Sequence, residues 1–296
     1  MKVGICLPYM NHGITREDYE KWFKAVDDGP FHSLCCGERV HGPAMDMRIL
    51  LASAASATRR IEICPTLYVL PMHNATRVAK EIATLDVLAG AGRMPYVAIG
   101  YGGREQDYQA VGASFQGRYS RMDAQVKELR RVWRGEEMVP GAGSIGPTCT
   151  TPCGPKLLSG ATGPKGIARS AKWADGLYAW SFNGELAELQ YSLGLADTAW
   201  AEAERTTRPY RLGGCWYTLA DNGQQKLHDY LYNYMLLAGA EAASALAAKV
   251  NRSSQDRVHA ALDNAEAASC DAFFLVPATA ELAEVDRLAD ILAVRQ

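Results

Sequence analysis

Short apolar runs alternate with amphipathic stretches along the whole chain. The apolar runs predict strands, and the stretches between them predict helices. The predicted strands are residues 3–8, 31–37, 61–68, 95–101, 156–160, 175–181, 210–219 and 270–276. The predicted helices are residues 15–28, 45–58, 74–90, 118–134, 164–173, 184–204, 222–249 and 279–294. This alternation predicts an α/β fold in which a parallel sheet closes into a (β/α)8 barrel, a TIM barrel.

Two segments are longer than a minimal barrel requires. Residues 135–155 are rich in Gly, Pro, Thr and Ser and indicate a long loop, and residues 222–268 carry more helix than one crossover needs. We expect both insertions to cover the face of the barrel that carries the site. No linker divides the chain, so residues 1–296 are predicted to form a single domain.

The amino-acid composition narrows the classes of molecule that the protein is expected to bind. The chain has 296 residues, a net charge of −2 and well-mixed charges, so neither nucleic acid nor a lipid surface is expected as a partner. It has no apolar run of about 20 residues, which a membrane span would need. Eight cysteines without disulfide spacing favour a reducing cytoplasm. Cys149 and Cys153 lack further ligands nearby, so we expect no metal site.

The middle of the chain carries a series of short motifs in a distinctive order. They comprise residues 60–71, 79–86, 92–93, 99–103, 110–112 and 118–133. Their order and spacing resemble those of the bacterial luciferase-like oxidoreductases, which use reduced flavin or its deazaflavin analogue. The resemblance implies a barrel with its site at the carboxyl ends of the strands.

The resemblance also implies where the cofactor ring lies. A cis peptide bond that is not followed by proline is expected between Thr66 and Leu67, where it would form a bulge behind the ring. Glycines at the end of the fourth strand, Gly100 and Gly102, would let the ring approach the backbone. Tyr101 stands where the flavin-using luciferase has an arginine that reaches the cofactor phosphate. This difference favours the deazaflavin coenzyme F420, with FMN as the alternative.

A turn of small residues follows the fifth predicted strand. Free N–H groups at a helix start attract anions, and small residues let a phosphate approach. The family binds the cofactor phosphate at this turn, which implies a phosphate cradle at Gly160, Ala161, Thr162 and Gly163. Without the resemblance, a plain strand-to-helix turn would explain these residues equally well.

The end of the second predicted strand carries the candidates for catalysis. Many relatives have a histidine after Glu38, whereas this chain has Arg39, which cannot perform acid–base chemistry. Arg39 could instead stabilise an anionic reduced ring or bind a substrate carboxylate. Glu38, His41 and Tyr9 are therefore the candidates for proton transfer. A structural pairing of Glu38 with Arg39 and a solvated loop role for His41 are the alternatives.

Side chains at other strand ends are candidates to bind a small organic substrate. They are His12, Tyr68, Trp180 and Trp216. Core packing explains the aromatic residues about as well.

The predicted function is oxidoreduction, by hydride transfer with F420 or by FMN-dependent monooxygenation. A flavin-binding protein without turnover and a barrel lyase or isomerase acting on a phosphorylated substrate are the other readings. The family commonly forms homodimers through the second and third helices, here residues 45–58 and 74–88. Leu50, Ala54 and Ala57 are predicted to face the partner.

Overall fold

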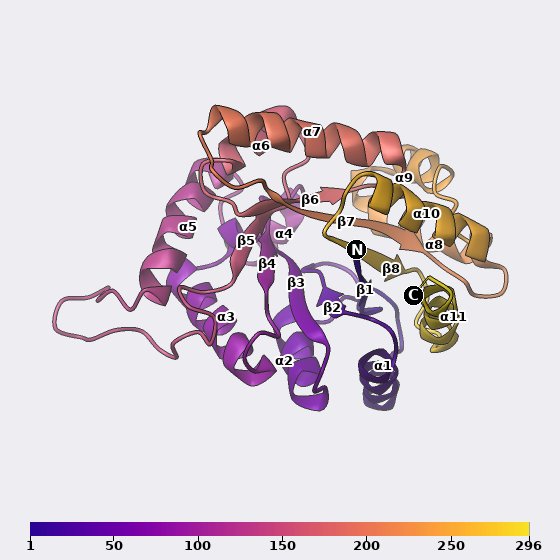
Figure 1. Ribbon diagram of the computed structural model, residues 1–296, viewed down its shortest axis with the longest axis horizontal. Helices are drawn as coiled ribbons and strands as arrows, with labels where there is room; N and C mark the ends of the chain where they lie inside the picture. The colour runs from indigo at the N-terminus through magenta and orange to yellow at the C-terminus, as the bar shows by residue number, and fades with distance from the viewer. Residues whose placement is uncertain (296) are drawn as a thin grey trace.

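Eight parallel strands form a closed barrel in the computed structural model, which describes residues 1–295 (Figure 1). Neighbouring strands pair in sequence order from β1 to β8, and β8 pairs with β1. The predicted (β/α)8 barrel is therefore confirmed. The strands are β1 (Lys2–Cys6), β2 (Ser33–Cys36), β3 (Glu62–Tyr68), β4 (Tyr96–Ile99), β5 (Lys156–Ser159), β6 (Gly176–Trp180), β7 (Tyr210–Tyr217) and β8 (Ala272–Pro277).

Helices surround the barrel and alternate with its strands (Figure 1). Those on the first half of the chain are α1 (Arg16–Asp28), α2 (Met47–Ala57), η1 (Leu70–Met72), α3 (Ala75–Ala89), α4 (Glu105–Ala110) and α5 (Arg118–Trp133). Those on the second half are α6 (Pro164–Ser170), α7 (Leu186–Glu202), α8 (Gly223–Met235), η2 (Leu236–Ala238), α9 (Ala240–Ala247), α10 (Gln255–Ala267) and α11 (Ala283–Ala293).

The helical region after β7 differs from the single long helix predicted at residues 222–249. Gly239 has φ of +103°, a conformation that other residues rarely adopt, and it separates η2 from α9. A further helix, α10, lies beyond residue 249. The chain therefore doubles back instead of running on, and α8 packs against α9.

Large apolar side chains fill the interior of the barrel. A Cβ added to Gly4 would lie 2.3 Å from the Phe274 ring and from the Ser33 hydroxyl oxygen. The glycine on β1 thus makes room for the fully buried Phe274 of β8. Close packing of this kind leaves the carboxyl ends of the strands as the place for a site.

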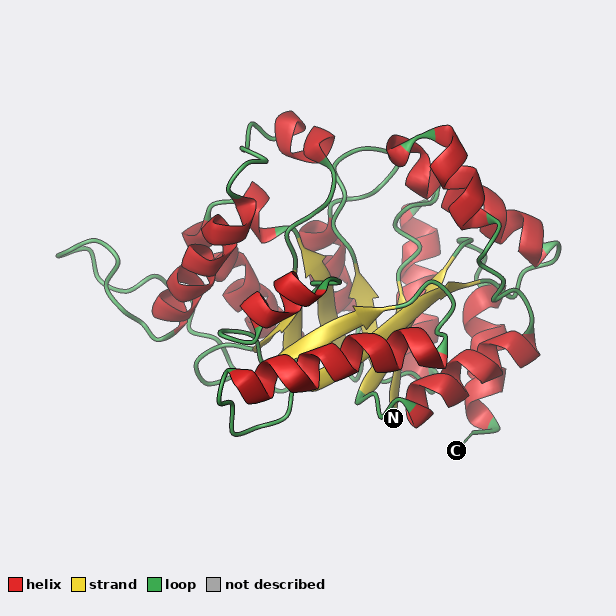
Figure 2. Ribbon diagram, turned by 90° about the horizontal axis from the view of Figure 1, so that it is seen from above, coloured by secondary structure: helices red, strands yellow, loops and turns green. Residues whose placement is uncertain are grey.

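The segment between α5 and β5 projects from one side of the molecule (Figures 1 and 2). Its base is fixed to α3: the Lys80 ammonium donates to the Gly146 carbonyl (2.7 Å), and the buried Asp86 carboxylate accepts from the Thr150 hydroxyl (2.8 Å) and the Thr151 N–H (3.0 Å). Because the segment leads from a helix into the start of a strand, it lies at the amino ends of the strands. The expectation that residues 135–155 cover the site is therefore wrong.

Helix α2 buries more of its surface than predicted. Leu50 is 6% exposed and Ala54 is fully buried within the protomer, so they are not available to a partner. They pack inward because α2 lies between α1 and α3 and is covered on both sides. Ile49, which is 71% exposed, is the large apolar side chain that α2 presents outward.

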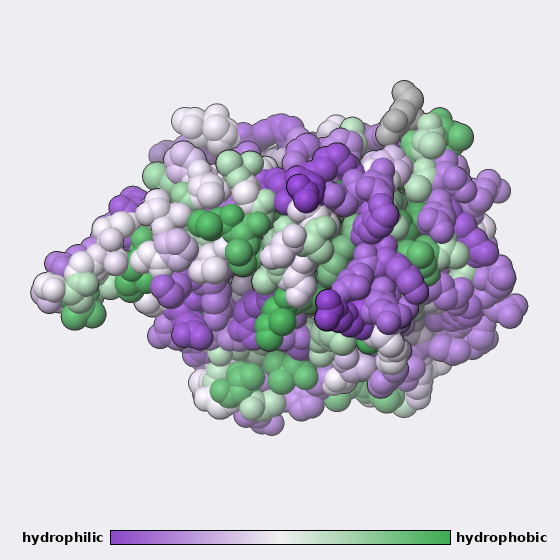
Figure 3. Space-filling model, turned by 90° about the horizontal axis from the view of Figure 1, so that it is seen from below, coloured by the Kyte–Doolittle hydropathy of each residue, from purple (hydrophilic) through white to green (hydrophobic). Residues whose placement is uncertain are grey.

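The surface is mixed in character. Figure 3 shows one face on which hydrophilic residues predominate and hydrophobic residues gather in small separate patches. No helix among residues 1–295 combines the length and apolar character needed to cross a membrane.

Candidate functional site

Two cavities open near the carboxyl ends of the strands. The first, here called the barrel cavity, has a volume of about 690 Å³ and is lined by strand ends and the loops after them. The second, here called the side cavity, has a volume of about 750 Å³ and lies between the loop after β1, helix α8 and residues 278–281. Arg39 and Tyr234 line both cavities and so stand at their border.

The wall of the barrel cavity includes the end of β3. The Thr66–Leu67 peptide bond is cis, as predicted, and the register with β4 shifts between Thr66 and Tyr68. Both Thr66 and Leu67 line the cavity. A Cβ on Gly160 would lie 2.4 Å from Leu67 Cδ2, and one on Gly100 would lie 3.0 Å from Leu67 Cδ1. The two glycines therefore give the Leu67 side chain its room.

Two predicted ligand-binding tyrosines lie outside both cavities. Tyr68 is 1% exposed in the core, because the register shift after Thr66 changes the direction of the strand end. Tyr101 packs against Tyr119 with a centroid separation of 4.6 Å and lies near Gly166 of α6. Gly102 does line the barrel cavity, and its φ of +61° and contact with Val69 favour glycine there.

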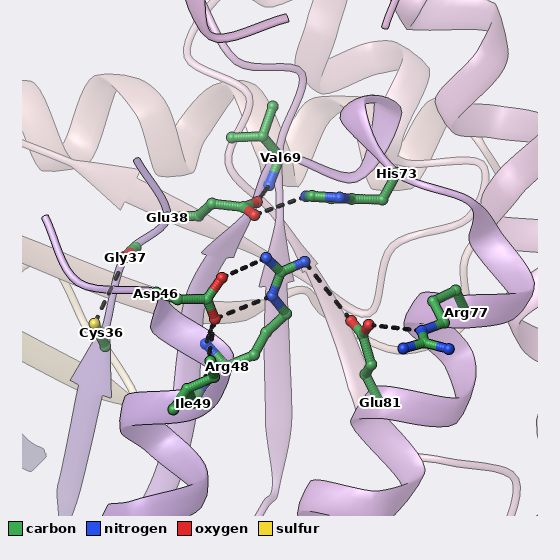
Figure 4. A network of polar contacts seen from close by, with 10 residues as sticks. All are labelled: Cys36, Gly37, Glu38, Asp46, Arg48, Ile49, Val69, His73, Arg77 and Glu81. Carbon is green, nitrogen blue, oxygen red and sulfur yellow. Dashed lines mark hydrogen bonds and ion pairs between the residues drawn. The ribbon is translucent and has the colours of Figure 1, made fainter. Parts of the chain in front are cut away.

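Glu38 pairs with His73, as Figure 4 shows, and not with the predicted partner Arg39. Its carboxylate lies 2.7 Å from His73 Nε2 and accepts a hydrogen bond of 2.7 Å from the Val69 N–H. The Glu38 side chain is 6% exposed and lines the barrel cavity. Its two contacts connect the end of β2 to the loop after β3, so the proposed structural role has a different partner from the one predicted.

Asp107 of α4 connects Arg39 with His41. One carboxylate oxygen, Oδ1, lies 2.7 Å from His41 Nδ1 and accepts from the His41 backbone N–H at 3.1 Å. The other, Oδ2, lies 3.7 Å from Arg39 Nε, which is an ion pair without a hydrogen bond. His41 lines the side cavity and its side chain is 43% exposed. A carboxylate that fixes one imidazole nitrogen in this way leaves the other free for proton exchange.

Buried hydroxyl and thiol groups line the barrel cavity beside these residues. Burial raises the pKa of Tyr9 well above its usual value, with the phenols of Tyr234 and Tyr230 adding to the effect. Burial also raises the pKa of the Cys6 and Cys35 thiols. All three groups therefore remain protonated near neutral pH, and neither thiol is an activated nucleophile.

The turn between β5 and α6 is partly open. The Gly160 N–H donates to the Ile99 carbonyl (2.8 Å) and the Ala161 N–H to the Ser159 hydroxyl (3.2 Å), so both are already used within the chain. Thr162 is exposed and lines the barrel cavity with Gly160. A Cβ on Gly163, the N-cap of α6, would meet no heavy atom within 4 Å. Of the four residues predicted to hold a phosphate, Thr162 and Gly163 are therefore the ones with open surroundings.

The loop after β7 is closed to an anion by the chain itself. The buried Glu284 carboxylate of α11 accepts hydrogen bonds from the Leu219 N–H (2.7 Å), the Ala220 N–H (3.3 Å) and the hydroxyls of Thr218 and Thr279. Many barrels bind a substrate phosphate at the loops after strands seven and eight. In this protein the Glu284 carboxylate already accepts hydrogen bonds from the N–H groups of the loop after β7.

The predicted aromatic residues meet at one side of the barrel cavity. The rings of Trp180 and Trp216 have centroids 4.6 Å apart, and Trp216 lies 5.3 Å from both Phe182 and Tyr234. These four residues, here called the aromatic wall, all line the barrel cavity. His12 lies apart from them and lines the side cavity.

A family model for luciferase-like monooxygenases matches residues 1–294. The chain belongs to the luciferase-like monooxygenase family. The family resemblance expected from the motifs of residues 60–133 is thereby confirmed.

Several solved structures share the fold across nearly their whole length. The monooxygenase RslO1 from Streptomyces bottropensis is 21% identical, with a TM-score of 0.76 and coverage of 99% of this chain and 98% of that one. The coenzyme F420-dependent tetrahydromethanopterin reductase from Methanopyrus kandleri is 13% identical, with a TM-score of 0.76 and coverage of 99% of each chain.

A third similar structure contains FMN. It is the oxygenating constituent of 3,6-diketocamphane monooxygenase from Pseudomonas putida, which is 15% identical, with a TM-score of 0.71 and coverage of 100% of this chain and 98% of that one. None of the curated proteins matches this chain.

Several residues at the site of this luciferase-like protein escape prediction from sequence. Asp107 lies on α4, which has only six residues and too few apolar positions to show a helical period. Tyr234 lies within a long predicted helix, where nothing distinguishes it from neighbouring tyrosines. Arg104 follows the fourth strand, but its contact with α8 depends on the tertiary fold. Its Nη2 donates to the Tyr234 carbonyl at 2.5 Å.

Proposed function

We propose that this protein is an oxidoreductase that binds a flavin-type cofactor in the barrel cavity and that the cofactor is coenzyme F420. The observation that carries the proposal is a cavity of about 690 Å³ at the carboxyl ends of the strands, with Thr66 and Leu67 of β3 and the four residues of the aromatic wall in its lining. A cavity of this size suits a fused-ring ligand together with a small substrate. When bound, the cofactor would supply hydride transfer at its ring, and the protein would orient the ring and exclude water.

The side chains that line the barrel cavity also favour a redox cofactor. Among the described residues lining it there is no lysine for a Schiff base, and its thiols are held protonated. A barrel lyase or isomerase acting on a phosphorylated substrate would use the loops after β7 and β8, where Glu284 takes the N–H groups. These features make that alternative less favourable than oxidoreduction.

The β5–α6 turn fits the single charge of a phosphodiester better than a phosphate monoester. A monoester such as that of FMN carries about −1.5 to −2 at pH 7, whereas the phosphodiester of F420 carries one negative charge. The turn itself, residues 160–163, has no cationic side chain, and Lys165 in the first turn of α6 is exposed. Tyr101, which stands at the position of the luciferase arginine, is packed against Tyr119. We therefore propose Thr162 and Gly163 as the phosphate contacts, with Gly160 and Ala161 shaping the turn.

The residues at the end of β2 have different proposed roles. Arg39 keeps its charge and cannot move a proton. Tyr9, whose pKa is raised, would hold a proton at its hydroxyl and act as a donor of hydrogen bonds. His41 would exchange a proton at Nε2, because Asp107 occupies Nδ1. Glu38 would fix the bulge through Val69 and His73.

Titration of the purified protein with each cofactor tests the proposal. F420 and FMN, each oxidised and reduced, are added while absorbance and fluorescence are followed. We expect saturable binding of F420 that is tighter than the binding of FMN. Tighter binding of FMN would instead favour the monooxygenase alternative, and binding of neither would overturn the proposal. Binding followed by no turnover with any carbonyl, alcohol or alkene substrate would favour a flavin-binding protein.

A further inference from the structure

Two arginines flank one tyrosine at the border between the cavities. The Arg39 guanidinium carbon lies 4.9 Å from the centroid of the Tyr234 ring, and that of Arg104 lies 4.8 Å from it. Arg104 also donates to the Tyr234 carbonyl, which fixes its position relative to α8. Arg39 comes from the end of β2 and Arg104 from the loop after β4, so the fold brings both cations to the same aromatic ring.

The donors of these arginines are only partly used. The Arg39 side chain is 9% exposed, and its Nε and Nη1 atoms are buried without a hydrogen-bond partner among the described residues, as is Nη1 of Arg104. The nearest carboxylate, Asp107, is 3.7 Å from Arg39 Nε and is already hydrogen-bonded to His41. Glu38 is bonded to Val69 and His73. A buried guanidinium without acceptors is costly, so an acceptor from a ligand would stabilise it.

The aromatic wall adjoins these cations. Tyr234 contacts Trp216 and both arginines, so flat apolar surface continues directly into the charged region. A guanidinium binds a carboxylate through two parallel hydrogen bonds, and aromatic rings pack against flat ligands. The combination suits a ligand with a flat apolar body and an anionic group at one end.

We propose that the substrate of this enzyme is a flat organic anion, a carboxylate or a similar oxyanion, held by Arg39 and Arg104 with its body against Trp180 and Trp216. The proposal rests on the proposed function in that the rest of the barrel cavity is left for the cofactor. Arg39 lines both cavities. The anion therefore binds at the border, and the side cavity gives it a route to solvent.

Binding of 2-naphthoate and 2-naphthamide tests the proposal, because the two probes share a shape and differ in charge. Each is titrated into the full-length protein by calorimetry, with quenching of tryptophan fluorescence as a second readout, with and without F420. We expect naphthoate to bind about 10- to 100-fold more tightly than naphthamide, the usual range for hydrogen bonds to a charged group. Equal affinities, or no saturable binding of naphthoate at millimolar concentration, would overturn the proposal.

Variants then assign the preference to its residues. Arg39→Met keeps an unbranched apolar stem and removes one of the two charges, so naphthoate affinity should fall toward that of naphthamide while naphthamide affinity stays unchanged. Arg104→Gln should reduce the preference in part and gives the answer even if Arg39→Met does not fold. Arg16→Met on α1, whose native side chain is 90% exposed, is the matched control and should bind both probes as the native protein does. A preference for naphthoate that is undiminished in both site variants would contradict the assignment.

The outcomes separate this proposal from the proposed function. Loss of the carboxylate preference in Arg39→Met with unchanged F420 binding supports the anion site. Failure of F420 to bind, together with an Arg39-dependent preference for naphthoate, would overturn the cofactor assignment and keep the anion site. F420 binding without any preference for naphthoate would overturn the anion site and keep the cofactor assignment.

Discussion

The substitution Gly163→Asp is the sharpest test of where the cofactor phosphate lies. Gly163 is the N-cap of α6, with φ of −107° and ψ of 157°, and this extended conformation suits any residue. An added Cβ would meet no atom within 4 Å. Aspartate is also a favoured N-cap residue, so the helix should be stabilised by a few tenths of a kcal/mol relative to glycine. A loss of cofactor binding would therefore not come from unfolding.

The expected magnitude follows from the charge introduced. Two negative charges about 5 Å apart repel by roughly 1 kcal/mol in water and about 3 kcal/mol at an effective dielectric constant of 20. The neighbouring Thr162 is exposed, so the lower part of that range applies. We expect cofactor binding to weaken by about 1–2 kcal/mol, which is roughly 5- to 30-fold in Kd.

The assay is a fluorescence titration of F420 at two ionic strengths. Gly163→Asn is the matched control, since it has nearly the same shape and capping ability without the charge, and its affinity should stay close to that of the native protein. Added salt should narrow the gap between the two variants, because salt screens an exposed pair of charges. Native affinity in Gly163→Asp, with an unchanged Tm, would place the phosphate elsewhere. Gly160→Asp would be a poorer test, because its Cβ would lie 2.4 Å from Leu67.

Three further predictions concern stability, reactivity and assembly. Burial raises the pKa of the Glu284 carboxyl, so the folded protein holds this proton to higher pH than the unfolded chain does. The free energy of unfolding, measured by urea titration, should therefore fall relative to that of Glu284→Gln as pH rises from the usual carboxyl range through the folded pKa. Parallel pH profiles of the two proteins would contradict this. Cys153 is the exposed thiol and the other seven thiols are buried. Ellman's reagent should therefore react rapidly with one thiol per folded chain and with none in Cys153→Ser. A second rapidly reacting thiol would refute the burial pattern. If the predicted homodimer forms through α2, the exposed Ile49 lies in the interface, and Ile49→Glu should halve the mass in equilibrium sedimentation. Leu50→Glu should instead unfold the protein, because Leu50 is buried within the protomer. An unchanged dimer mass in Ile49→Glu would exclude the outer face of α2 as the interface.

The strands were predictable because most of their residues are apolar. β8, Ala272–Pro277, is buried at every position, as expected for a strand of a parallel barrel covered on both faces. Helix α5 begins at Arg118, where it was predicted, and ends one residue early. Helix α1 was predicted within one residue of its start, where Thr15 and Asp18 form a capping box whose two hydrogen bonds are local. Local rules suffice for such elements.

The site was less predictable because its contacts join residues far apart in the chain. Glu38 and His73 are 35 residues apart, and His41 and Asp107 are 66 apart. Neither pairing leaves a periodic signal. The hydrophobic pattern also could not predict the direction of a side chain at a strand end. The register shift at Thr66 places Tyr68 in the core, while Leu67 lines the barrel cavity.

The distribution of charge around the barrel gives the two proposed ligands an orientation. Glu284 makes the loop after β7 unsuitable for an anion, which leaves the β5–α6 turn for the cofactor phosphate. Arg39 follows β2, which is three strands away from β5 around the eight-stranded barrel. A cofactor whose phosphate lies at Gly163 extends its ring toward the Thr66–Leu67 bulge of β3, since Leu67 packs against Gly160 at the base of the turn. The substrate anion and the cofactor phosphate are then held by separate residues, so the two negative ligands do not compete for one site.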